Sequence, residues 1–269
     1  MVKPNDNTTL FDPDARRVAR RRAASSFDQY RFLHDMAWGQ ILDRLGDVRR
    51  DFGARHNLSA HDFDNETEAL AFEPESLALI TSCLNLHAVN DLPGLLVQIR
   101  KSLKPDGLFM AAMFGGETLY ELRESLMETE LTLKGGASPR VFPFADKQQM
   151  GGLLQRAGFA LPVVDSDIVR VSYEDIFKLM HDLRGMGESN VIAARSRINP
   201  GKAFFTRAGQ YYQEHFTEKD GRITASFEII YLIGWAPHES QQQPLKPGSA
   251  ERRLADALMT REEKAGEPL

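Results

Sequence analysis

Two short runs of almost continuously apolar residues, 77–86 and 108–113, flank a segment with a different pattern. Between them, over residues 92–103, apolar positions recur every three or four residues, which indicates a helix with one buried face. A short run that is apolar throughout is typical of a parallel strand covered on both sides. The pattern therefore predicts a strand, a helix and a second strand joined as a right-handed βαβ unit.

Polar and turn-forming residues mark the ends of these elements. Asp91 and Pro93 supply an N-cap and a first-turn proline for the helix, and residues 104–107 have the composition of a turn. Beyond the second strand, residues 118–133 return to helical spacing. The loops after the two strands are expected at the carboxyl edge of a parallel sheet, where open α/β sheets bind ligands.

The remaining pattern divides the chain into four segments. They are an N-terminal helical lead at 1–50, a polar connector at 51–67, an α/β domain at 68–240 and a polar C-terminal tail at 241–269. Within the α/β domain the pattern further predicts a helix at 146–157, a strand at 161–171, helices at 176–184 and 203–215, and a last strand at 223–235.

Composition and charge narrow the class of protein. With 42% hydrophobic and 26% charged residues and a net charge of -5, the 269-residue chain has an ordinary globular composition and no overall charge that favours nucleic acid. The arginine-rich stretch at 16–22 is the local exception, interpreted as a solvated helix face, with a docking role as the alternative. No apolar run is long enough to span a membrane.

The single cysteine, Cys83, suits a reducing compartment and is expected to be a buried small hydrophobe, since it lies inside an apolar strand. The N-terminus has no apolar core of a signal peptide, and its three aspartates, Asp6, Asp12 and Asp14, are atypical of an arginine-rich transit peptide. We therefore expect the cytoplasm of a bacterium, or the mitochondrial matrix if the source is eukaryotic.

Several segments together resemble a known family. The order LNLHAVND, helix, LKPDGLF, strand, helix, LLQRAGF resembles the second half of a class I S-adenosylmethionine-dependent methyltransferase. Longer motifs, MFGGETLYELR at 113–123, KGGASPRVFPF at 134–144, LMHDLRGMGESN at 179–190 and GWAPHES at 234–240, are similar to the methyltransferase-like complex I assembly factors and their alphaproteobacterial relatives. The resemblance implies a truncated Rossmann-like α/β fold with a helical lead and a helical insertion before the last strand.

One part of the family pattern is missing. The family has a first strand, a glycine-rich cofactor loop, a helix and a second strand after the lead, whereas here residues 52–67 provide 16 residues and no G-x-G-x-x-G motif. One βαβ unit needs about 30 residues, so these elements cannot all be present. The chain rejoins the pattern at EALAFEPES, residues 68–76, which indicates an internal deletion. We therefore expect S-adenosylmethionine binding to be lost or impaired.

The resemblance still implies candidate residues on both sides of a cleft. On the cofactor side they are Glu66, Thr67, Leu84 and His87. Leu84 has a core residue as its alternative, and His87 a capping or surface histidine. On the substrate side they are Phe114, Gly115, Gly116, Glu117 and Tyr120, facing Met186, Gly187, Glu188, Ser189 and Asn190.

The chemistry of the substrate side suggests a protein side chain as ligand. Glu117 and Glu188 are suited to bidentate binding of a guanidinium. The alternative is that Gly115 and Gly116 serve only to turn the chain from the strand into the helix, and that GMGESN, residues 185–190, serves only to end a helix.

The family is also associated with hydroxylation of a protein arginine, so the resemblance also raises the hypothesis of a metal oxygenase site. A facial triad needs two histidines and a carboxylate, and His56, His61 and Asp62 or Asp64 lie together in the connector. No helical or strand spacing fixes them on one face. Chance clustering is the favoured interpretation, and no metal site is predicted.

These observations lead to two hypotheses. In the first, the chain has lost or impaired cofactor binding and acts by binding a protein client, such as a respiratory complex I subunit. In the second, it is an active methyltransferase, or a protein-arginine-modifying enzyme, with an unorthodox cofactor site. Deleting central strands would leave an open sheet edge, so we also expect either a homodimer or a rearranged lead that covers the edge.

Overall fold

The computed structural model describes residues 9–59, 62, 68–242, 256 and 259–260. The chain divides into two compact units, residues 1–237 and 238–269. The described part of the second unit contains a turn in which the backbone N–H of Gln241 donates to the carbonyl oxygen of His238. All the elements discussed below belong to the first unit.

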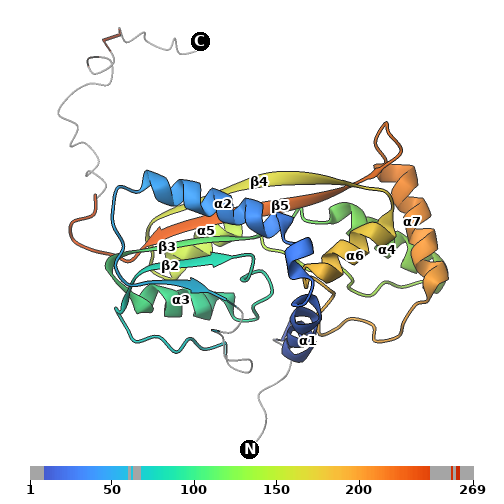
Figure 1. Cartoon of the computed structure of the whole chain (residues 1–269), viewed down its shortest axis with the longest axis horizontal. Helices are drawn as coiled ribbons and strands as arrows, with labels where there is room; N and C mark the ends of the chain where they lie inside the picture. Colours follow the sequence, from blue (N-terminus) through green and yellow to red (C-terminus); the bar gives the residue numbers. More distant parts are fainter. Residues whose placement is uncertain (1–8, 60–61, 63–67, 243–255, 257–258, 261–269) are drawn as a thin grey trace, which may run out of the picture. The chain divides into compact units, whose positions relative to one another are not determined.

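The first unit is built on a five-stranded sheet with the strand order β1-β2-β3-β5-β4 (Figure 1). Its strands are β1 (Arg55–Leu58), β2 (Leu77–Cys83), β3 (Leu103–Phe114), β4 (Ala160–Tyr173) and β5 (Ile223–Trp235). The first three are parallel, and β5 is antiparallel to both β3 and β4. The sheet therefore has a parallel half next to an antiparallel half.

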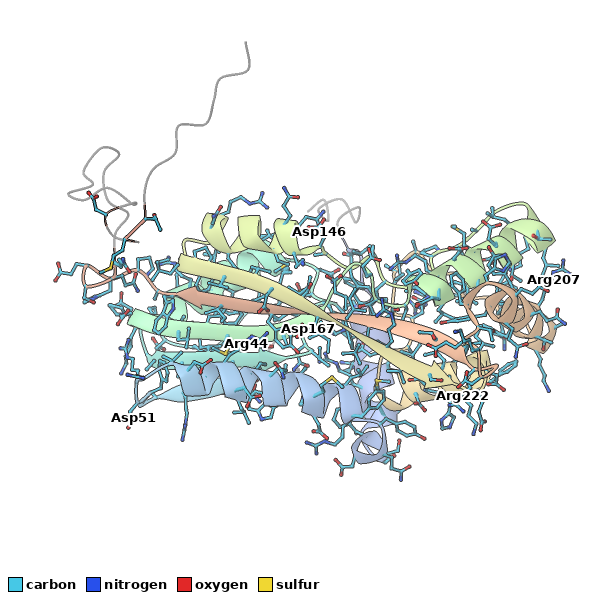
Figure 2. The ribbon with its side chains drawn as sticks, turned by 90° about the horizontal axis from the view of Figure 1, so that it is seen from above. Arg44, Asp51, Asp146, Asp167, Arg207 and Arg222 are labelled. Carbon is cyan, nitrogen blue, oxygen red and sulfur yellow. The ribbon has the colours of Figure 1, made fainter. Side chains whose placement is uncertain are left out.

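Helices cover both faces of the sheet. They are α1 (Pro13–Ala23), α2 (Phe32–Asp47), α3 (Leu92–Ser102), α4 (Tyr120–Lys134), α5 (Lys147–Arg156), α6 (Ile176–Gly185) and α7 (Lys202–Phe216), with a short 3-10 helix at Phe27–Gln29. α2 packs along one face, while α3 and α5 pack on the other (Figures 1 and 2). α6 and α7 lie between β4 and β5 in the sequence, as the predicted helical insertion, and α7 packs on α4.

Residues 108–114 of β3 are apolar throughout because both of their faces are covered. Met110 and Ala112 pack into the cluster under α2, whereas Phe109 and Ala111 pack into the cluster under α3 and α5. Since successive side chains of a strand point to opposite faces, a strand covered on both faces needs apolar residues at every position.

The long helices and strands of the α/β domain confirm the pattern-based predictions, and two predictions were wrong. The connector contains a strand, because the four residues of β1 pair in parallel with β2 from Arg55↔Leu79 to Leu58↔Ser82. Residues 104–107 belong to β3 rather than to a separate turn, since a register shift between Leu77 and Leu79 and the left-handed Asp106 (φ 60) accommodate the extra residues. Among the described helices, none is long and apolar enough to cross a bilayer.

Candidate functional site

A cavity of about 400 Å³ lies at the carboxyl ends of β1 and β2, on the side where the N-terminal lead packs. We call it the lead-side cavity. The lead contributes Arg20, Ala23, Ala24, Phe27, Tyr30, Arg31, Leu33 and His34, and the strand ends contribute Ser59, Cys83, Leu84 and Asn85. This is the edge of the sheet at which the sequence predicts a ligand site, and the volume falls within the range of small-molecule pockets.

A second cavity of about 270 Å³ lies between the end of β3 and helices α4, α6 and α7. We call it the phenylalanine cavity, because five of its lining residues are Phe114, Phe142, Phe144, Phe205 and Phe227. Phe114 and Glu188 line both cavities. The two cavities therefore meet at these two side chains.

Glu188 is held at this junction by a buried histidine. His87 Nε2 and Glu188 Oε2 are 3.0 Å apart, and the His87 side chain is only 1% exposed. The imidazole is enclosed by the rings of Phe114, Phe142 and Phe144. A hydrogen bond shielded from water in this way fixes the carboxylate of Glu188 in one position.

Two arginines of α1 approach the same junction. Arg16 Nη2 donates to the carbonyl oxygen of Asn85 at 2.6 Å, and Arg20 Nη2 donates to Asn85 Oδ1 at 3.1 Å. Burial opposes ionisation of Glu188, but the interactions with His87, Arg20 and Arg16 outweigh it and lower the pKa of this carboxyl. Burial and the neighbouring Arg20 lower the pKa of Arg16 to about 10. Glu188 is therefore an ionised hydrogen-bond acceptor at neutral pH.

Local backbone conformations place these groups. Leu84, directly after β2, has a left-handed φ of 49, and its N–H donates to the carbonyl oxygen of Ala112. Asn85 Nδ2 donates to the carbonyl oxygens of Leu58 and Cys83, which ties the end of β1 to the end of β2. On the opposite side, Gly187 has a φ of +85, which lets the chain turn out of α6 and present Glu188.

On the cofactor side, the structure brings Leu84 and His87 to the junction region. Leu84 lines the lead-side cavity and also belongs to the core. The alternative of a surface His87 is wrong, because the residue is buried. Glu66 and Thr67 lie outside the described residues.

The predicted substrate-side residues are divided between several environments. Gly115 is needed for close packing, since a Cβ there would lie 2.6 Å from a Glu228 carboxylate oxygen. The backbone N–H of Glu117 donates to that carboxylate, while the Glu117 side chain is exposed and lines neither of the two cavities. Tyr120 is 40% exposed. The guanidinium clamp predicted for Glu117 and Glu188 is therefore not assembled at the junction.

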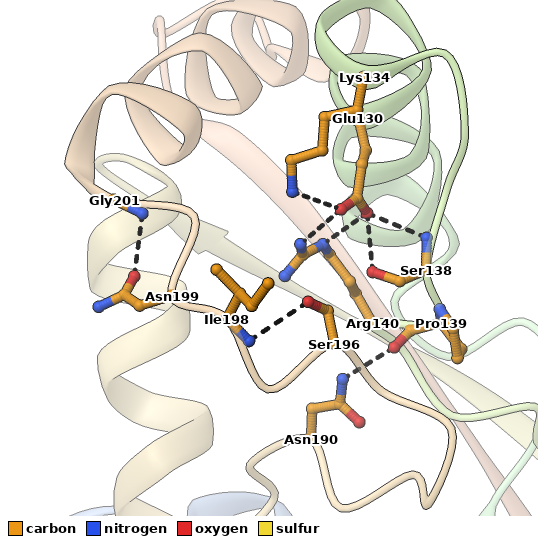
Figure 3. A network of polar contacts seen from close by, with 10 residues as sticks. All are labelled: Glu130, Lys134, Ser138, Pro139, Arg140, Asn190, Ser196, Ile198, Asn199 and Gly201. Carbon is orange, nitrogen blue, oxygen red and sulfur yellow. Dashed lines mark hydrogen bonds and ion pairs between the residues drawn. The ribbon is translucent and has the colours of Figure 1, made fainter.

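Asn190 and Gly116 lie closer to the phenylalanine cavity. Asn190 lines it, and its Nδ2 donates to the carbonyl oxygen of Pro139 at 2.9 Å (Figure 3). Gly116 is half-buried, and a Cβ there would meet the carbonyl oxygen of Phe144 at 3.8 Å. Neither glycine has a positive φ, so close packing explains Gly115 better than a turn does.

A carboxylate network supports the rim of the phenylalanine cavity. The buried Glu130 of α4 accepts hydrogen bonds from Arg140, Lys134 and Ser138 (Figure 3). Arg140 lowers the pKa of Glu130 well below its usual range, because its charge and hydrogen bonds outweigh the burial of the carboxyl. The network fixes the segment that carries Phe142 and Phe144.

Two residues of the histidine and aspartate cluster in the connector, His56 and Asp62, contact each other. His56 Nε2 lies 2.9 Å from Asp62 Oδ1, and Asp62 Oδ2 accepts from both the N–H and the hydroxyl of Ser59. His61 and Asp64 lie outside the described residues. Among those that the structure does describe, no group of three His, Cys, Asp or Glu side chains is arranged to hold a metal ion.

Burial raises the pKa of the Cys83 thiol to about 12, as fits a buried small hydrophobe.

Sequence reasoning missed Arg16, Arg20 and Asn85 as site residues. The arginine stretch was interpreted as solvated, which holds for the exposed Arg17, Arg21 and Arg22 but is wrong for Arg16 and Arg20. Their i, i+4 spacing was the available signal, because it places both on the helix face that buries Ala19 and Ala23.

Comparison with known proteins shows the family to which the chain belongs. Residues 2–162 match the model of a family described as "Methyltransferase domain". The chain is 36% identical over 286 residues to the protein named arginine-hydroxylase NDUFAF5, mitochondrial, of Danio rerio, with 92% of this chain and 89% of that protein covered. It is 33% identical to a malonyl-[acyl-carrier protein] O-methyltransferase of Gallionella capsiferriformans, over 64% of this chain and 57% of that protein.

Among solved structures, an S-adenosylmethionine-dependent methyltransferase of Thermotoga maritima is 11% identical and covers 81% of this chain and 99% of its own, with a TM-score of 0.41. The chain is therefore a methyltransferase-domain protein, and its structure is of the α/β class. Within that class, the chain belongs to the NDUFAF5 family.

Proposed function

We propose that this chain acts by binding a protein client and that its S-adenosylmethionine binding is lost or impaired. The observation that carries the proposal is the hydrogen bond from the backbone N–H of Ser59 to Asp62 Oδ2, at 2.6 Å. Ser59 directly follows β1, where a class I methyltransferase uses the free N–H groups of a glycine-rich loop to hold the cofactor. Here that N–H is already bonded to a carboxylate.

The composition of the loop adds to this mismatch. Asp62 also accepts from the Ser59 hydroxyl and from His56, so its carboxylate is held by the residues at the end of β1. Asp62 also brings a negative charge to the end of β1, and the methionine part of the cofactor carries a carboxylate of the same sign. In the sheet as described, β1 is the edge strand, and no further strand supplies a carboxylate for the ribose. The residues that the structure describes around the end of β1 therefore do not fit the usual contacts of S-adenosylmethionine.

The relatives support the same interpretation. The aligned region of 286 positions is longer than the 269-residue chain, so the Danio rerio protein has residues without a counterpart here. That protein is named an arginine-hydroxylase, mitochondrial, which is consistent with a protein client. The resemblance of the sequence motifs to complex I assembly factors makes a respiratory complex I subunit the proposed partner. The client would be met in the bacterial cytoplasm, or in the mitochondrial matrix if the source is eukaryotic.

The phenylalanine cavity is the proposed place where a client side chain binds. It is apolar, it is held open by a rigid rim, and Glu188 offers an ionised acceptor at its inner end. An apolar cavity with a few fixed polar groups is typical of a binding site.

A second candidate function is favoured by the lead-side cavity. Its volume of about 400 Å³ is enough for a small molecule, and it lies at the sheet edge where the family binds its cofactor. An active methyltransferase, or a protein-arginine-modifying enzyme, would use this cavity with the lead residues in place of the missing loop.

Thermal unfolding with and without S-adenosylmethionine separates the two functions. A ligand that binds only the native state raises the melting temperature, so an enzyme should be stabilised and transfer a labelled methyl group to purified complex I subunits. The client-binding proposal expects no shift and no transfer, but binding to one such subunit that Glu188→Ala weakens. Glu117→Ala is the matched control, because the Glu117 side chain is exposed and lines neither cavity.

A further inference from the structure

A third hollow, an open groove of about 820 Å³, runs between α1 and the segment that follows α6. We call it the arginine groove, after its lining residues Arg22, Arg184, Arg195 and Arg197. Asp12 and Asp14 are the acidic residues of its lining. The exposed arginines of α1 have no role in the site described above. One of them, Arg22, lies on this surface.

Both carboxylates of the groove already have cationic partners. Asp12 Oδ2 accepts from Arg195 at 3.1 Å and from Arg197 at 3.3 Å, and Asp12 Oδ1 caps α1. Asp14 pairs with Arg17 at 2.7 Å. Within the described part of the chain, no carboxylate forms an ion pair with Arg22 or Arg184. The groove therefore presents an excess of positive charge.

The walls of the groove are fixed to one another. Phe11 and Ile192 form an antiparallel bridge. On either side of it, the N–H of Asp12 donates to the carbonyl oxygen of Val191, and the N–H of Ala193 donates to the carbonyl oxygen of Leu10. Phe11 N also donates to Asn90 Oδ1, which anchors the bridge beside α3. A partner can therefore bind without first ordering these segments, which reduces the entropic cost of association.

The arginine groove continues into the phenylalanine cavity. Arg184, Ser189 and Asn190 line both. An extended segment lying in the groove would pass the mouth of the apolar cavity, so one of its side chains can enter while its neighbours remain over the arginines. The two surfaces thus select for charge and for an apolar anchor at the same time.

We propose that the partner of this surface is an acidic protein segment that places a large apolar side chain in the phenylalanine cavity. The inference rests on the proposed client-binding function and names the chemistry of the client. Carboxylates of the segment would pair with Arg22 and Arg184, whose charges are not neutralised within the described chain. The apolar anchor would be buried among Phe142, Phe144 and Phe205.

Fluorescence anisotropy with labelled peptides tests this proposal on the full chain. The probe is a peptide of glutamates around a central phenylalanine, with lysines in place of the glutamates in one control and serine in place of the phenylalanine in the other. We expect the acidic phenylalanine peptide to bind most tightly and its affinity to fall as salt is added, because exposed charge pairs are screened. Equal binding of the lysine peptide, of the serine peptide, or of single-stranded DNA of similar length would overturn the proposal.

Two charge reversals locate the binding surface. Arg22→Glu and Arg184→Glu should each weaken binding of the acidic peptide about fivefold or more, since each replaces an attraction by a repulsion. Arg207→Glu is the matched control, because Arg207 is exposed on α7 and lines a different hollow (Figure 2). An equal loss in Arg207→Glu, or no loss in the two groove variants, would contradict the assignment.

Measuring S-adenosylmethionine affinity on the same samples keeps the two proposals apart. A chain that binds the cofactor tightly and also binds the acidic peptide overturns the loss of cofactor binding and leaves the groove assignment in place. A chain that binds neither overturns the groove assignment alone.

Discussion

The imidazole of His87 and the carboxylate of Glu188 come from positions 101 residues apart in the chain and meet with Nε2 and Oε2 at 3.0 Å. His87 follows β2 in the parallel half of the sheet, whereas Glu188 follows α6 in the helical insertion. The contact therefore joins the parallel half of the sheet to the helical insertion. It also sets the position of the Glu188 carboxylate, which lines both cavities.

Replacing His87 by phenylalanine should show the strength of this contact. The variant keeps an aromatic ring between Phe114 and Phe144 but removes the donor, so Glu188 is left with Arg16 and Arg20 alone. We expect the free energy of unfolding in urea to fall by about 1–3 kcal/mol. In a double-mutant cycle with Glu188→Gln, the coupling should be about 0.5–3 kcal/mol, and strict additivity would contradict a direct interaction.

Gly185 and Tyr30 provide a test of how the lead docks on the insertion. A Cβ on Gly185 would lie close enough to the Tyr30 ring to force it away. Gly185→Ala should therefore lower the free energy of unfolding by about 1–3 kcal/mol. In a protein that already carries Tyr30→Ala, the same glycine substitution should cost much less, because the ring that it would meet is gone.

Gly39→Ala in α2 is the control for the Gly185 substitution. Nothing lies within 4 Å of a Cβ at Gly39, so the change should stabilise the helix by about 1 kcal/mol. If both glycine substitutions stabilise the protein in thermal unfolding, the packing of Tyr30 against Gly185 is wrong.

The Glu130 network predicts a pH dependence of stability. Because the folded-state pKa of Glu130 is lowered, its contribution is present above the ordinary glutamate pKa of about 4.3 and is lost as the pH falls below it. Glu130→Gln should cost about 3 kcal/mol or more at pH 7 and make the stability curve flatter between pH 5 and pH 3. Asp35→Asn, which removes an exposed pair with Arg31, should cost about 1 kcal/mol or less.

The edge position of β1 keeps the prediction of a dimer open to test. In the described structure β1 pairs with β2 on one side, and α2 packs on the face of the sheet. We expect sedimentation velocity over a range of concentrations to show a dimer, because an unpaired strand edge tends to pair with another chain. A single monomeric species at all concentrations would contradict it.

The sequence predicted the elements whose own residues have a clear apolar pattern or a clear cap. β2 is mostly apolar and residues 108–114 of β3 are wholly apolar, and α3 is preceded by Asp91, whose side chain accepts from the N–H of Gly94 as an N-cap. β1 has no such pattern, since its four residues, RHNL, leave only Leu58 buried. Pairing with β2 made it a strand, and that pairing is a tertiary contact that no local pattern records.

The site was predictable only as far as the family motifs reach. The motifs pointed to His87 and Glu188, but the burial of His87 depends on Phe142 and Phe144, which are distant in sequence. Glu117 stands in an equally specific motif and yet its side chain faces solvent. Which side of a turn a side chain takes is decided by packing, here by the Glu228 carboxylate that accepts from the Glu117 N–H.

Isothermal titration calorimetry of the full chain with S-adenosylmethionine tests the central claim most directly. Since the Ser59 N–H is bonded to Asp62 and no glycine-rich loop follows β1, we predict no saturable heat up to millimolar ligand. Saturable binding with micromolar affinity that Leu84→Arg abolishes would contradict the account, because it would place a working cofactor site in the lead-side cavity.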